Sequence, residues 1–159
     1  MKMKMLLIPT LVLSLAACST VDSDGEKDEV DKKDVEEIVL KDPNSNQKGD
    51  FLVSAKTKGS TVIANLTYIG TEDAKKISHG SNIFRINVKQ KDGNFEYMGV
   101  IGRSYVETFL EKEVSHTFEL DLVKDLNAPK GTYEVEIHTE FSDDKGSVEI
   151  PVSIVVEIN

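Results

Sequence analysis

The chain has 159 residues, of which 39% are hydrophobic and 30% are charged, and its formal net charge is −9. This length is sufficient for one domain with its own hydrophobic core. The acidic balance argues against nucleic acid or anionic lipid head groups as partners, because both would repel the chain.

Residues 1–17 have the features of a secretory signal peptide. Lys2 and Lys4 precede residues 5–17, which carry no charge and are mostly apolar. This apolar stretch is too short to cross a bilayer, which takes roughly 20 residues. Its length is that of a signal-peptide core, and the small residues Ala16 and Ala17 at its end are what cleavage requires.

Cys18 follows directly and is the one cysteine of the chain, so a disulfide within the chain is excluded. The tetrapeptide Leu15-Ala16-Ala17-Cys18 resembles the lipobox of bacterial lipoproteins, in which a diacylglycerol is joined to the cysteine and the chain is cut before it. The resemblance implies that Cys18 is the lipidated N-terminus of a mature protein. The implied location is the extracytoplasmic face of the cell membrane, which the protein contacts through its lipid, because two or more acyl chains anchor stably.

Residues 18–48 are expected to form an acidic, flexible tether. Acidic residues outnumber basic ones after Cys18, and aromatic residues are absent. Such a composition buries too little apolar surface to offset the entropy lost on ordering. Val35–Leu40 is the exception, and its pattern is compatible with a short helix or with a first edge strand.

Residues 49–159 show the period-two alternation of β-strands. Apolar residues, with Thr139 as the one exception, occupy every second position of residues 133–141 and 147–158, so one face of each strand is expected to be buried. Similar runs occur at residues 51–57, 61–69, 83–90, 95–101, 105–110 and 116–122. Short turn sequences separate them, and no stretch has a sustained helical period.

The pattern predicts an all-β fold, an antiparallel immunoglobulin-like β-sandwich of about 7–8 strands. A small closed barrel is the alternative. Pro151 lacks an amide hydrogen, so its strand is expected at a sheet edge or with a bulge. The sequence "LNAPKGTYEVEI" resembles the tyrosine corner of immunoglobulin-like domains. That resemblance implies that the Tyr133 hydroxyl bonds backbone a few residues upstream, with Leu126 packed beneath it.

Residues 81–137 also resemble the intracellular proteinase inhibitor family of bacilli. The similarity lies in "SNIFRINVKQKDGNFEYMGV", "FLEKEVSHTFELDL" and "APKGTYEVEI". It implies a small β-sandwich and, as an alternative function, inhibition of proteinases at the cell envelope.

The sequence predicts neither an enzyme nor a cofactor or metal site. His79, His116 and His138 lack the close spacing of zinc ligands. Nucleophile-elbow and phosphate-binding glycine motifs are absent from the sequence. We therefore expect a non-enzymatic binding or accessory module of the cell envelope with a protein partner.

The segment "YMGVIGRSYVETFL", residues 97–110, is the candidate partner surface. Tyr97, Arg103 and Tyr105 are its leading residues, because tyrosine, methionine and arginine are favoured at interface cores. The alternative is that these side chains pack the core and its rim.

Overall fold

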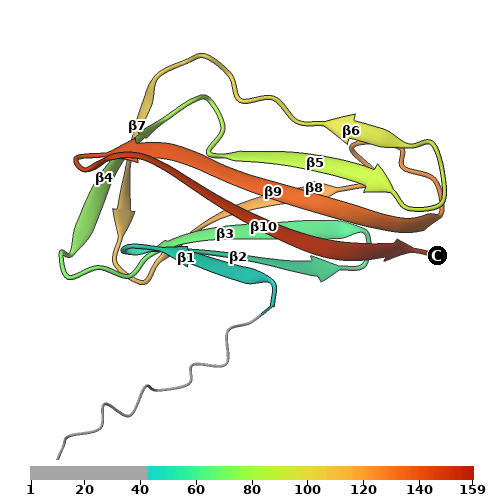
Figure 1. Ribbon diagram of the computed structural model, residues 1–159, viewed down its shortest axis with the longest axis horizontal. Helices are drawn as coiled ribbons and strands as arrows, with labels where there is room; N and C mark the ends of the chain where they lie inside the picture. Colours follow the sequence, from blue (N-terminus) through green and yellow to red (C-terminus); the bar gives the residue numbers. More distant parts are fainter. Residues whose placement is uncertain (1–42) are drawn as a thin grey trace, which may run out of the picture. The chain divides into compact units, whose positions relative to one another are not determined.

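The computed structural model describes residues 43–159, and these residues form strands and turns without a helix (Figure 1). The ten strands of this part are β1 (Ser45–Lys48), β2 (Phe51–Lys58), β3 (Thr61–Tyr68), β4 (Ala74–His79), β5 (Phe84–Gln90), β6 (Glu96–Met98), β7 (Val106–Glu111), β8 (Ser115–Asp121), β9 (Gly131–Asp143) and β10 (Gly146–Ile158). The predicted all-β class is confirmed. The predicted signal peptide, Cys18 and most of the predicted tether lie outside the described residues. Residues 43–159 hold no helix long and apolar enough to cross a membrane.

The strands form two antiparallel sheets that lie face to face (Figure 1). The first sheet has the order β1-β2-β3-β8. In the second sheet β9 is central: β10 pairs with its whole length on one side, and β5 and then β4 pair with it on the other. β6 extends the sheet beyond β5, and β7 extends it beyond β4. This two-layer arrangement is the predicted antiparallel sandwich.

The core lies between the two sheets and follows from the alternation in the sequence. On β10 the buried side chains occupy every second position from Ile150 to Val156, and β9 shows the same pattern from Tyr133 to Phe141. Apolar residues of β2 and β3 face them from the first sheet, and those of β5 lie beside them in the second sheet. The outward positions between them carry glutamate or histidine on β9 and mostly polar residues on β3 and β5, so each sheet has one buried face and one solvent-facing side.

Two strands were not predicted from the sequence. The sequence predicts a tether that includes residues 45–48, but these residues form β1 and pair with β2. The sequence Ser-Asn-Gln-Lys has no apolar residue, so it gives no signal of alternation, and the strand is held mainly by backbone pairing. β4 was missed because Lys75 occupies one of its buried positions beside Ile77, which hides the period of two.

Pro151 and Tyr133 lie as predicted. β10 pairs within its sheet only with β9 among the described strands, so Pro151 is on an edge strand. The Tyr133 hydroxyl donates a hydrogen bond to the Pro129 carbonyl, four residues upstream. The Tyr133 ring is fully buried and meets Phe95 edge to face, with ring centroids 5.7 Å apart. Leu126 is half-buried against the same core.

Candidate interaction surface

Large apolar side chains are exposed along the segment from β6 to β7. The exposed fractions are 69% for Met98, 77% for Val100, 74% for Tyr105 and 67% for Phe109. We call residues 98–109 the β6–β7 strip. In Figure 1 its connecting part runs from β6 beyond one end of β5 towards β7. Exposed apolar residues gathered in one segment are typical of contact surfaces.

Two close backbone approaches hold the strip, one against β5 and one against the connection between β4 and β5. The Gly99 amide donates to the Ile86 carbonyl at 3.0 Å, and the Ser81 amide donates to the Gly102 carbonyl at 3.3 Å. A Cβ on Gly99 would lie 2.6 Å from the Ile86 carbonyl oxygen, and one on Gly102 would lie 1.9 Å from the Ser81 hydroxyl oxygen. The two glycines are therefore needed for the backbone of the strip to pack this closely.

Tyr105 is exposed on its ring and fixed at its hydroxyl. This hydroxyl shares a hydrogen bond of 2.8 Å with the Ser78 hydroxyl and lies 3.4 Å from a carboxylate oxygen of Glu107. Glu107 also forms an ion pair of 2.7 Å with Lys76. The hydrogen bond from Lys76 is the main cause that lowers the pKa of Glu107, and it raises the pKa of Lys76. The polar end of Tyr105 thus has partners, while its ring is available for contact.

Arg103 and Tyr105 line the same hollow, whose volume is about 540 Å³. β4, the β6–β7 strip and the end of β9 form its wall. Its lining residues are Ser78, His79, Gly80, Ile101, Gly102, Arg103, Ser104, Tyr105, Ser142 and Asp143. The structure therefore brings together two of the three predicted contact residues.

Tyr97 lies elsewhere. It pairs with Val88 across β5 and β6, and it is half-buried against the core. It lines a separate hollow of about 210 Å³ together with Met98, Glu134 and Glu136. For Tyr97, packing against the core is thus the observed state, and the neighbouring Met98 presents the larger exposed surface.

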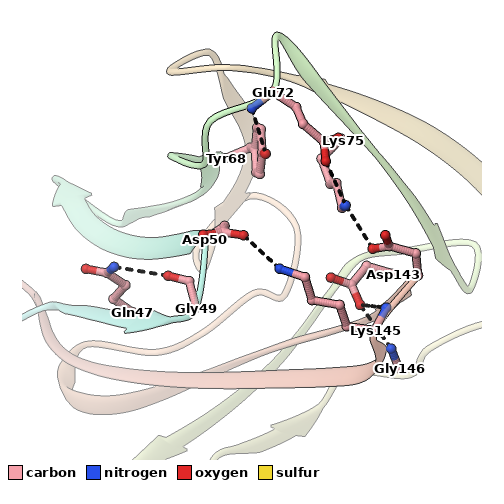
Figure 2. A network of polar contacts seen from close by, with 10 residues as sticks. Gln47, Gly49, Asp50, Tyr68, Glu72, Lys75, Asp143, Lys145 and Gly146 are labelled. Atoms are coloured by element: carbon pink, nitrogen blue, oxygen red, sulfur yellow. Dashed lines mark hydrogen bonds and ion pairs between the residues drawn. The ribbon is translucent and has the colours of Figure 1, made fainter.

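A network of polar contacts surrounds the turn of the β9–β10 hairpin (Figure 2). Lys75 is almost fully buried and contacts carboxylate oxygens of Asp144 at 2.8 Å and of Glu72 at 3.5 Å. Its hydrogen bond to Asp144 is the main cause that raises the pKa of Lys75 and lowers the pKa of Asp144. Lys145, which follows Asp144 in the turn of the β9–β10 hairpin, pairs with a carboxylate oxygen of Asp50 at 3.1 Å. The network ties the β9–β10 hairpin to the start of β2 and to the β3–β4 connection.

Comparisons with known proteins assign no family to the chain. No family model matches it, and no curated protein does. The solved structure titled "X-ray structure of Northeast Structural Genomics Consortium target SoR45" is 9% identical in sequence, with a TM-score of 0.44. The match covers 71% of this chain and 90% of that one.

Proposed function

We propose that this protein is a lipid-anchored binding module of the bacterial cell envelope. In this proposal Cys18 carries the lipid, the acidic residues after it give reach, and the β-sandwich binds a protein partner outside the cytoplasm. The module is non-enzymatic and works by contact, as an accessory to another envelope protein.

The exposed apolar β6–β7 strip is the observation that carries the binding proposal. Four large side chains within residues 98–109 are about two-thirds exposed or more. Burying apolar surface on a partner contributes about 25 cal/mol per Å². The hydrogen bonds that fix Tyr105 and the strip backbone reduce the entropy lost on binding. Arg103, exposed beside Tyr105, supplies a cation at the rim of the same surface.

We also propose immunoglobulin-like topology for the sandwich. Pairing of β2, β3 and β8 corresponds to the order A-B-E, and pairing of β6, β5, β9 and β10 corresponds to C′-C-F-G. Tyr133 at the start of β9 supports this correspondence, because the tyrosine corner lies at the start of strand F. β4 and β7 form an additional pair at one end of the second sheet.

Proteinase inhibition is the second candidate. An inhibitor needs an exposed segment held in a fixed shape. Residues 99–105 are irregular and are tied to β5 at Gly99 and to the β4–β5 connection at Gly102. Titration of the purified protein against a panel of serine proteases separates the two candidates. Stoichiometric inhibition at nanomolar concentration would favour the inhibitor, whereas unchanged protease activity favours the binding module.

Co-purification from native membranes tests the binding proposal. The tagged full chain is compared with Tyr105→Ala, Phe109→Ser and Arg103→Ala. Val155→Ser is the matched control, because Val155 is an exposed apolar residue on β10. It lies opposite Glu134, at the other end of β9 from Ser142, which lines the hollow with Arg103 and Tyr105. We expect a partner that is lost or strongly weakened in the three strip variants and retained in the control. Equal retention in all four would reject this surface.

A further inference from the structure

We propose that the wet face of the β9–β10 hairpin carries a site for a divalent transition-metal ion, with His138, Glu140 and Glu149 as its ligands. Glu140 lies directly opposite Glu149 in the pairing of β9 with β10. His138 precedes Glu140 by two residues and therefore lies on the same face. One nitrogen or oxygen atom from each of the three residues lies within 4.8 Å of the other two.

The contacts around the cluster leave ligand atoms for an ion. Nε and Nη2 of Arg85 both bind the same oxygen of Glu140, Oε1, at 3.2 and 2.7 Å. Oε2 of Glu140 has no contact of its own among the hydrogen bonds and ion pairs of residues 43–159. Nδ1 of His138 lies 3.2 Å from Oε1 of Glu149, so these two atoms are close enough to bind the same ion.

Neighbouring residues orient the ligands. Two hydrogen bonds from Arg85 hold the Glu140 carboxylate, as donors next to the ligands do in metal sites. Oε2 of Glu136 lies 3.7 Å from Nε2 of His138, which is longer than a hydrogen bond. Nδ1 of His138, the ring nitrogen 3.2 Å from Glu149, is therefore the ligand atom. Because β9 and β10 pair over their whole lengths, the ligands sit on a rigid frame.

Charge favours a divalent cation at this position. Two carboxylates directly opposite each other on a sheet repel. The carboxylates of Glu136, Glu140 and Glu149 and the guanidinium of Arg85 sum to a formal charge of −2. A divalent cation between the ligands neutralises that charge.

The donor set selects the class of ion. One imidazole and two carboxylates suit Zn²⁺ and related transition ions. Ca²⁺ requires six or more oxygen ligands, and Mg²⁺ requires an octahedral oxygen shell, so both are disfavoured. Three protein ligands leave a coordination position for water or for a side chain of a partner, and Glu149 is exposed enough for ions to exchange.

Zinc titration of the full chain in detergent tests the site. All proteins carry Cys18→Ala, because a free thiol is itself a zinc ligand. Zn²⁺ is added in competition with a chromophoric chelator, and thermal unfolding is recorded with and without Zn²⁺. The variants are His138→Ala and Glu149→Gln. The controls are Glu157→Gln, which removes a carboxylate of β10 outside the cluster, and His116→Ala, which removes another imidazole.

We expect the parent to bind about one equivalent of Zn²⁺ and both cluster variants to bind it at least tenfold more weakly. Zinc should raise the melting temperature of the parent and of both controls but not that of the cluster variants. Two results would overturn the proposal: equal affinity in the parent and Glu149→Gln, or an equal loss in Glu157→Gln and Glu149→Gln. Glu149→Gln keeps the test decisive if His138→Ala fails to fold, because its side chain is exposed.

Discussion

Replacing Tyr133 with phenylalanine isolates the contribution of the buried tyrosine corner. The substitution keeps the fully buried ring and its edge contact with Phe95, and it removes only the hydroxyl that donates to the Pro129 carbonyl. Loss of one hydrogen-bond partner costs about 1–3 kcal/mol when the other group stays buried. Pro129 is exposed, so water can replace part of the lost bond. We therefore expect a loss of about 1.5 kcal/mol.

The corresponding fall in melting temperature follows from the size of the described domain. Unfolding entropy is about 2.1 cal/mol/K per residue, which gives about 0.25 kcal/mol/K for about 120 residues. A loss of about 1.5 kcal/mol then lowers the melting temperature by about 6 °C. Tyr97→Phe is the matched control. Tyr97 is half-buried, and its hydroxyl has no hydrogen bond among the described contacts. Calorimetry of both variants in parallel measures the difference.

The pH dependence gives the same experiment a second readout. Burial raises the pKa of the Tyr133 phenol above its ordinary value of 10.0. The stability linked to Tyr133 is therefore complete below about pH 10 and is lost as the pH rises through the folded-state pKa. The stability gap between wild type and Tyr133→Phe should be constant at neutral pH and narrow above about pH 10. A variant as stable as Tyr97→Phe, or a gap that widens at alkaline pH, would refute the reasoning.

Three further predictions concern the polar network, the anchor and the tether. Lys75 lowers the pKa of Asp144 from 3.8, so the wild type should lose part of its stability as the pH falls below about 4. Asp144→Asn has no carboxylate to protonate, so urea unfolding should show a smaller loss of stability in this variant over the same pH range. If Asp144→Asn loses as much stability at acid pH as the wild type, the role of the ion pair is contradicted. Cys18→Ala should release the protein from the membrane or leave an uncleaved precursor, as fractionation and mass spectrometry can determine, and a wild-type protein with an unmodified thiol would exclude the anchor. Limited proteolysis of the full chain should trim residues 19–42 and spare residues 43–159. Early cuts within β2 to β10 would show that this domain boundary is wrong.

The sequence predicts the fold where burial is one-sided. Along β9 the outward positions from Glu134 to Glu140 carry glutamate or histidine, and along β10 Ile150, Val152, Ile154 and Val156 are buried at every second position, so the period of two is visible without a structure. Tyr133 was also recognisable, because a proline-glycine turn before a buried tyrosine has one common use in sandwiches. The two missed strands lack this signal. β1 is polar at every position, and β4 carries Lys75 on its buried face.

The candidate sites depend on strand pairing and register, which alternation alone does not give. Tyr105 is identified from its residue type, but its partner Ser78 lies on β4, which the sequence does not predict. The cluster at His138 is missed for a related reason. His138 and Glu140 share one strand, and only the register of β10 against β9 places Glu149 opposite Glu140. That register is fixed by the length of the hairpin turn.

Site-specific photo-crosslinking in native membranes tests the central claim, a lipid-anchored module that binds a protein through the β6–β7 strip. A photoreactive amino acid replaces Tyr105 in the full chain, and in a control it replaces Lys56, which is exposed on β2 in the other sheet. The account predicts one discrete crosslinked species from position 105 in the membrane fraction, absent from position 56 and lost when Cys18 is also changed to alanine. Identical crosslinks from both positions, none from position 105, or a species unaffected by Cys18→Ala would contradict it.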